Sequence, residues 1–272
     1  METFTHSSAF AAQALQGRAV LVVGAGQAAS DDATLVGNGR AISLVLASLG
    51  AVVHCADRSE AAAGATVDAI RAAGGQARAL VADVADPAAV RGLVDEAAID
   101  GPLHGLVLNV GISDRKPLAQ ITADSWDAIF SVNLRGHMLC AQAALPRMAQ
   151  GGAIVFISSL AARMPAGRNP TYEASKAALP ALCRAVALEG HARDIRANIV
   201  AAGLVDTPMG RSASQARPER ARMALPFGRQ ATASDIAAAV AFLLSDASRY
   251  INAVELPVDG GLAHGIARAP SA

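Results

Sequence analysis

A tyrosine and a lysine, Tyr172 and Lys176, stand four residues apart in a chain that has only two residues of each type. On a helix, positions four apart lie on the same face, so the lysine ammonium can approach the phenol. At ~4 Å and an effective dielectric of ~20, one positive charge favours the phenolate by roughly 4 kcal/mol. This interaction lowers the tyrosine pKa from ~10 toward neutrality, where a phenol can act as general acid and base. The pair therefore predicts proton transfer to or from a substrate.

Glycines at an expected turn from strand to helix indicate a site for a phosphate-bearing ligand. Gly24 and Gly26 follow a short apolar run, and Gly37, Asn38 and Gly39 open the next helical stretch. Such a turn lets the backbone approach a pyrophosphate, whose charge is favoured by a helix N-terminus. A turn with only a structural role is the alternative, because a scattered glycine pattern is weak by itself.

An acidic residue follows at the distance expected for a dinucleotide site. Asp57 ends the second apolar run, 18 residues after Gly39, where a carboxylate can accept hydrogen bonds from both hydroxyls of an adenosine ribose. The alternative is a capping residue before the helix that begins near Glu60. We expect NAD to be preferred over NADP, because a 2′-phosphate would meet a like charge at Asp57. Arg58 could instead pair with that phosphate.

Short apolar runs alternate with helical stretches along the chain, which is the pattern of βαβ units and of a parallel sheet covered on both faces. No shift in composition marks a linker. The prediction is one α/β domain of the doubly wound Rossmann type, with a seven-stranded parallel sheet and helices on both faces. The expected strands are 19–23, 52–56, 79–82, 105–109, 153–158, 195–201 and 254–258, and the expected helices include 40–49, 60–73, 126–148, 172–190 and 234–244.

Composition disfavours several other classes of protein. The 23 basic residues balance 23 acidic ones and only 3% of residues are aromatic, so no nucleic-acid partner is expected. The apolar stretch 41–53 is too short to span a bilayer, so no membrane partner is expected either. Cys55, Cys140 and Cys183 are odd in number and lack close pairing, which indicates a reducing compartment such as the cytoplasm. The histidines show no metal-ligand spacing, so no metal is expected.

Taken together, these residues resemble the short-chain dehydrogenase/reductase family from about Gly17 to Gly261. The most specific matches are Tyr172 with Lys176, Ser159 thirteen residues before the tyrosine, and Asn133 in a Val-Asn-Leu-Arg-Gly stretch. The resemblance implies that Tyr172 exchanges a proton with the substrate oxygen while Ser159 hydrogen-bonds to that oxygen. It also implies that Lys176 binds the nicotinamide ribose and that Asn133 holds a water linking the lysine to solvent.

The resemblance further implies a cofactor, a domain plan and an assembly. The domain would span 17–263, with an irregular arm before it at 1–16, a substrate lid at about 208–230 and a tail at 264–272. A homotetramer would be built on the helices around 141–148 and 172–190, although an intramolecular core would also explain their alanine-rich faces. The residues implied in binding NAD or NADP are Gly24, Gly37, Asn38, Gly39, Asp57, Arg58, Asp83, Val84, Asn109, Gly111, Tyr172, Lys176, Gly203, Val205 and Thr207.

Departures from the family pattern concern the cofactor loops and one helix. The interval from Gly24 to Gly37 is longer than usual, and the insertion at 27–36 contains two aspartates that a pyrophosphate would repel, so we expect it to loop outward. Other differences are Val23 for threonine, Val110 for alanine and Ala202 for proline. Pro180 lies inside the helix expected at 172–190, where it removes the bond to the carbonyl of Lys176.

The hypothesis is therefore an NAD(P)-dependent oxidoreductase that interconverts a secondary alcohol and a ketone by hydride transfer, using a Ser-Tyr-Lys-Asn site. A reductase of 3-oxoacyl thioesters is one alternative, and a non-catalytic nucleotide-binding sensor or scaffold is another. The partner is a small-molecule alcohol or ketone. Arginines in the lid region would suit an anionic substrate or would merely solvate a helix: Arg211, Arg217, Arg220, Arg222 and Arg229.

Overall fold

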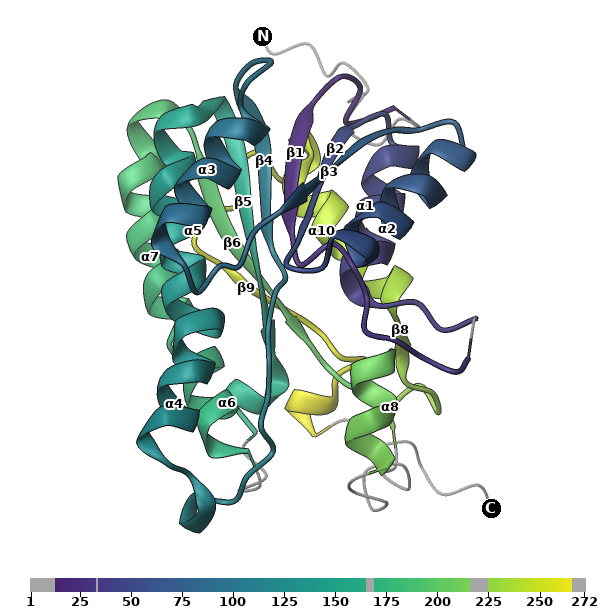
Figure 1. Cartoon of the computed structure of the whole chain (residues 1–272), viewed down its shortest axis with the longest axis vertical. Helices are drawn as coiled ribbons and strands as arrows, with labels where there is room; N and C mark the ends of the chain where they lie inside the picture. Colours follow the sequence, from purple (N-terminus) through teal and green to yellow (C-terminus); the bar gives the residue numbers. More distant parts are fainter. Residues whose placement is uncertain (1–12, 33, 165–168, 216–224, 266–272) are drawn as a thin grey trace, which may run out of the picture.

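The computed structural model describes residues 13–32, 34–164, 169–215 and 225–265 (Figure 1). Seven strands form one parallel sheet in the order β3-β2-β1-β4-β5-β6-β9. They are β1 (Ala19–Val23), β2 (Val52–Asp57), β3 (Gln76–Val81), β4 (Leu103–Leu108), β5 (Met148–Ser159), β6 (Arg196–Ala202) and β9 (Glu255–Val258). A separate pair joins β7 (Val205–Asp206) to β8 (Ala231–Thr232). The predicted strands and fold class are confirmed.

Helices cover both faces of this sheet (Figure 1). One apolar layer lies under α1, α2 and α10, and the other lies under α3, α5 and α7. The strand order turns back between β1 and β4, which leaves a crevice at the carboxyl ends of these strands where such folds bind their ligands. The helices are α1 (Asn38–Ser48), α2 (Glu60–Ala72), α3 (Pro87–Ala97), α4 (Ala123–Phe130), α5 (His137–Ala144), α6 (Pro170–Ala177), α7 (Leu179–Gly190), α8 (Pro208–Gln215) and α10 (Ala233–Leu244).

The helix expected at 126–148 is instead divided into several segments. A π-helical segment, Ser131–Gly136, separates α4 from α5. A short 3₁₀ turn containing Pro146 follows α5, and Met148 already begins β5. Proline cannot donate its backbone bond to the preceding turn, which explains the early end of the helix. The π segment carries Asn133 and sets the direction of its side chain.

The helix expected at 172–190 is also divided, at the place where Pro180 interrupts it. The first part, α6, ends at Ala177, and α7 begins at Leu179. The carbonyl of Lys176 accepts a hydrogen bond from the Ser158 hydroxyl at 3.3 Å. The Lys176 carbonyl, which receives no backbone bond from Pro180, is thus bonded to Ser158 instead. This bond joins α6 to β5, the two elements that carry the tyrosine, the lysine and both serines.

Several sequence-based expectations concern segments at the edge of the fold. The expected arm is only partly peripheral, because Leu15 is fully buried and its amide donates to the Leu49 carbonyl. Residues 1–12, 216–224 and 266–272 lie outside the described residues, together with three of the lid arginines. All three cysteines are buried and unpaired. Within the described part of the chain, no helix has the length and apolar character needed to cross a membrane.

Candidate active site

Tyr172 and Lys176 lie on one face of α6, as their spacing predicts. The Lys176 Nζ atom lies 5.9 Å from the centre of the Tyr172 ring and donates to the Ile157 carbonyl of β5 at 2.9 Å. The lysine side chain is almost completely buried, and this burial lowers its pKa to about 8. The ammonium is therefore held in place beneath a half-buried phenol.

Asn133 fixes the chain segment that faces this lysine. Its Oδ1 accepts from the Ile112 amide at 2.8 Å, and its Nδ2 donates to the Ile112 carbonyl at 2.9 Å and to Ser175 Oγ at 3.0 Å. A side chain at Gly111 would place its Cβ 3.4 Å from Lys176 Nζ and 3.6 Å from Asn133 Oδ1. The glycine thus leaves space between the asparagine and the ammonium.

Ser159 ends β5 on the same side of the sheet. Its hydroxyl oxygen accepts a hydrogen bond from the Ala161 amide at 3.2 Å, so the hydroxyl hydrogen can still be donated. The residue is half-buried, whereas its neighbour Ser158 is buried and bonded to the backbone of α6. The two serines thus have different surroundings, and Ser159 is the more accessible of the two.

His137 is a buried group next to this site that the sequence interpretation missed. Its Nε2 lies 2.9 Å from the Val110 carbonyl, and its Nδ1 has no hydrogen-bond partner. Burial, followed by the charge of Lys176, lowers the pKa of His137 to about 3, so the ring is neutral at neutral pH. A neutral ring whose Nε2 carries the hydrogen donates to Val110 and holds the turn after β4.

The glycine turn after β1 closes tightly against the turn after β4. Gly24 has a positive φ of 81°, and a Cβ there would lie 2.7 Å from the Val110 backbone. A Cβ at Gly39 would lie 1.9 Å from the Gly24 carbonyl oxygen, which also accepts from Asn109 Nδ2 at 2.7 Å. These positions admit only glycine, because any side chain would collide with backbone.

The beginning of α1 suits an anionic group. Gly37 is the N-cap and provides no side-chain bond to the first amides of the helix. Helix N-termini of this kind bind phosphates through free amides and the helix dipole. The residues present therefore fit the pyrophosphate of a dinucleotide, which is consistent with the predicted cofactor loop.

The adenosine end of the crevice is bounded by β2 and β3. Asp57 Oδ2 accepts from the Gly26 amide at 3.1 Å and Oδ1 accepts from the Ser59 amide at 3.0 Å, so the carboxylate is oriented by its own loop. Arg58 is exposed beside it. After β3, Asp83 is exposed and Val84 is buried. All four residues thus stand at the carboxyl ends of the strands where they were predicted.

The segment after β6 lies on the other side of the crevice. Gly203 has no room for a side chain, because a Cβ would lie 2.7 Å from Asp259 Cβ. Val205 pairs with β8, and Thr207 Oγ1 accepts from the Gly210 amide at 3.0 Å at the start of α8. The three residues therefore shape the path from the sheet into the lid.

The insertion at 27–36 contacts α8, where the lid is expected to begin. Its tip is exposed, as expected, but Asp32 accepts a hydrogen bond from Arg211 of α8 at 2.7 Å. Arg211 also donates two bonds to Asp206, at 2.7 and 2.9 Å. Hydrogen bonds from Thr34 and then from Arg211 lower the pKa of Asp32. The insertion is therefore bound to α8 through the ion pair of Asp32 with Arg211. No spacing in the sequence indicated this contact.

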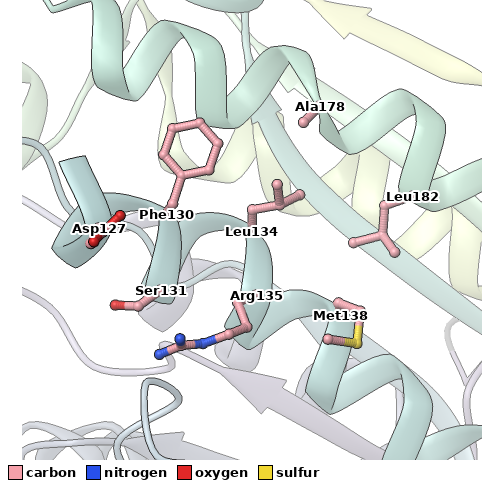
Figure 2. Close-up of a pocket in the computed structure, with 8 residues that line it drawn as sticks. All are labelled: Asp127, Phe130, Ser131, Leu134, Arg135, Met138, Ala178 and Leu182. Atoms are coloured by element: carbon pink, nitrogen blue, oxygen red, sulfur yellow. The ribbon is translucent and has the colours of Figure 1, made fainter. Parts of the chain in front are cut away.

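Another surface hollow lies on the helical layer. A groove of about 650 Å³ runs between the segment that joins α4 to α5 and the helices α6 and α7 (Figure 2). Figure 2 shows Leu134 and Leu182 pointing from opposite sides into the space between the helices. The alanines expected to form an interface at 141–148 do not line this groove. Ala141 and Ala144 are fully buried in the core of the protein.

Comparisons with known proteins agree with this geometry. The family described as enoyl-(acyl carrier protein) reductase matches residues 33–263. A short-chain type dehydrogenase/reductase of Picea abies is 39% identical, over 91% of this chain and 93% of the relative. A cis-4-hydroxycyclohexanecarboxylate dehydrogenase of Sinomonas cyclohexanicum is 38% identical, over 83% of this chain and 92% of the relative.

A solved structure extends the comparison to three dimensions. A short-chain dehydrogenase from Burkholderia cenocepacia in complex with NADP has a TM-score of 0.82 and 38% identity, over 92% of this chain and 99% of the other. The fold, the predicted enzyme class and the dependence on a nicotinamide cofactor are confirmed. The chain belongs to the short-chain dehydrogenase/reductase family, whose members interconvert alcohols and carbonyl compounds by hydride transfer.

Proposed function

We propose that Tyr172 is the proton-transfer group of an alcohol–ketone oxidoreductase, assisted by Ser159, Lys176 and Asn133. The observation that carries this assignment is the buried ammonium of Lys176 beneath the phenol of Tyr172. A charge in that position favours the phenolate and lets the phenol exchange a proton near neutral pH. Ser159 is placed to donate its hydroxyl hydrogen to the substrate oxygen.

A bound nicotinamide would supply the acceptor for a hydride from the carbinol carbon, or the donor of a hydride to a ketone. In the oxidative direction Tyr172, as the phenolate, would take the hydroxyl proton of the substrate while the electron pair of the C–H bond leaves with the hydride. Lys176 stays charged throughout and would hold the nicotinamide ribose. Asn133 orients the Ile112 segment beside the ammonium, and the space left by Gly111 would admit a water that carries the proton onward.

Replacing Tyr172 by phenylalanine tests the assignment. We expect turnover of an identified alcohol to fall by at least ~10²-fold, since general acid–base catalysis contributes that much or more, while the cofactor dissociation constant stays almost unchanged. Lys176→Ala should reduce turnover and also weaken cofactor binding. Near wild-type turnover in Tyr172→Phe would show that another group transfers the proton.

We further propose that NAD is preferred over NADP. The support is Asp57, whose carboxylate is held by two backbone amides at the end of β2, where a 2′-phosphate would meet its charge. NADP, the cofactor of the Burkholderia cenocepacia relative, is the alternative, and Arg58 is the residue that would pair with its 2′-phosphate. The ratio of kcat/KM for the two cofactors should shift toward NADP in Asp57→Ser. A wild-type preference for NADP would overturn the proposal.

The compartment and the assembly are also proposals. Three buried and unpaired cysteines are consistent with the reducing cytoplasm, and cell fractionation would test that location. The homotetramer implied by the family would use the exposed groove between Leu134 and Leu182 rather than the buried alanines of α5. The molar mass in solution tests it, since a monomer would contradict the assembly and leave the catalytic assignment standing.

A further inference from the structure

Hydrogen-bond acceptors without donors occur where the loop after β4 meets the beginning of α6. Both carboxylate oxygens of Asp114 are buried and accept no hydrogen bond from the described residues, and the same holds for Oδ1 of Asn169. The two segments are joined by a 2.7 Å hydrogen bond from Asn169 Nδ2 to the hydroxyl of Ser113, the residue before Asp114. Buried polar groups are rarely left unpaired, so these acceptors call for a ligand or a water.

The capping role that an asparagine usually has does not account for Asn169. This residue is the N-cap of α6, a position where the side-chain oxygen normally accepts a bond from a backbone amide of the first turn. Here the side chain makes no such bond, although the residue is only 8% exposed. Its Oδ1 is therefore left for another donor.

Both segments lie next to the proton-transfer residues. Asn169 precedes Tyr172 by three residues, and its carbonyl accepts the Glu173 amide in the first turn of α6. On the other side, Asp114 follows Ile112, whose backbone is clamped by Asn133, and Gly111, whose Cβ position lies 3.4 Å from Lys176 Nζ. The acceptors thus lie on the two segments next to Tyr172 and Lys176.

The charges nearby define which donors would fit. Arg211 and Arg229, the lid arginines that the structure describes, are paired with aspartates, and an anionic substrate would meet the unpaired carboxylate of Asp114. Arg115 donates to Ser212 and to the Met209 carbonyl instead of Asp114. Neutral hydroxyl groups satisfy unpaired acceptors without adding charge.

We propose that Asp114 and Asn169 form a specificity site for a second hydroxyl group, next to the one that is oxidised. The substrate class is then a neutral polyhydroxylated alcohol or the corresponding hydroxyketone. This inference rests on the proposed function, because the oxidised hydroxyl is the one that gives its proton to Tyr172 and its carbon-bound hydride to the nicotinamide. The second hydroxyl takes no part in bond breaking and only positions the substrate.

Alcohols with one three-carbon skeleton provide the test. Isopropanol has one secondary hydroxyl, propylene glycol adds a neighbouring hydroxyl, glycerol adds two, and isopropanolamine adds an ammonium. Their kcat/KM values would be measured in wild type, Asp114→Ala and Asn169→Ala. Asp68→Ala, which changes an exposed aspartate of α2, is the matched control, and cofactor dissociation constants report on the fold of each variant.

Wild type should use propylene glycol and glycerol at least tenfold better than isopropanol, since hydrogen bonds to charged acceptors discriminate by about that factor or more. Asp114→Ala should lose that preference, so that its kcat/KM for glycerol falls to its own value for isopropanol, and Asp68→Ala should keep the wild-type ratio. Equal use of isopropanol and glycerol, an unchanged ratio in both site variants, or a preference for isopropanolamine would overturn the specificity site and leave the proposed function intact. Absence of any Tyr172-dependent turnover on these alcohols and their ketones would overturn both.

Discussion

The two sides of the cofactor crevice are stabilised by different kinds of interaction. On the α6 side, Asn133 and Lys176 are almost completely buried and are bonded to the backbone at Ile112 and Ile157. On the α8 side, the insertion and the lid are joined by Arg211 and its two aspartates, whose side chains remain 37–47% exposed. Buried bonds to backbone fix positions, whereas exposed ion pairs are weak and screened by salt. The α6 side is thus held rigidly by buried bonds, whereas the α8 side is held loosely by exposed ion pairs.

The largest effect on stability is expected from Asn133→Ala. Removing this side chain leaves the amide and the carbonyl of Ile112 without partners, and each such group costs about 1–3 kcal/mol. We expect the free energy of unfolding to fall by about 2–4 kcal/mol in urea titrations. Gln150→Ala is the control, because Gln150 and its partner Asp194 are both exposed and water can replace the hydrogen bond between them. An equal fall in the free energy of unfolding in both variants would show that buried and exposed hydrogen bonds contribute alike here.

An intermediate effect concerns the pH dependence of stability. Burial lowers the pKa of Lys176 from 10.5 to about 8, so between these values the unfolded chain binds more protons than the folded one. The free energy of unfolding must therefore rise with pH across that window. We expect the melting temperature of wild type to rise relative to that of Lys176→Met from pH 8 to 10.5, with the trend fading about one pH unit below the lower of these values. A flat difference would show that the buried amine does not titrate there.

The smallest effect is expected at the insertion. Shortening 27–36 to three residues removes Asp32 and its ion pair, but we expect the cofactor dissociation constant to change by less than about threefold because exposed pairs contribute little. Asp32→Asn separates the loss of the ion pair from the loss of the loop. A large loss of affinity in a folded, shortened variant would show that the loop closes over the nucleotide, and the α8 side would then be more than a weak contact.

What could be predicted from the sequence depended on local pattern. The buried strands were found because parallel sheets require apolar runs, and Tyr172 and Lys176 were placed on one face because a helix has a fixed period. The ion pair of Asp32 with Arg211 joins residues 179 positions apart, and no local rule relates them. The hydrogen bond from Asn169 to Ser113 was missed for the same reason.

Near the catalytic helix, the sequence indicated some features and gave no sign of others. Pro180 indicated a break in the helix, but the Ser158 hydroxyl that bonds to the Lys176 carbonyl could only be identified from the packing of α6 on β5. Ser175, one residue before the lysine, belongs to the same short motif and proves to be a partner of Asn133. A π-helical segment around Asn133 has no comparable signal in this single sequence, so a continuous helix was expected there.

That π-helical segment also limits which changes in length the protein can tolerate. A π turn contains one residue more than the α-helical turn it replaces. Deleting one residue from 131–136 would therefore restore a regular α-helical turn and leave α5 in its present register, so that His137 keeps the Val110 carbonyl. Deleting one residue from α5 before Cys140 would instead rotate the rest of the helix by about 100° about its axis. Cys140 and Ala144 would then turn away from the core they now fill. The helix thus tolerates a change in length at the π turn but not within α5.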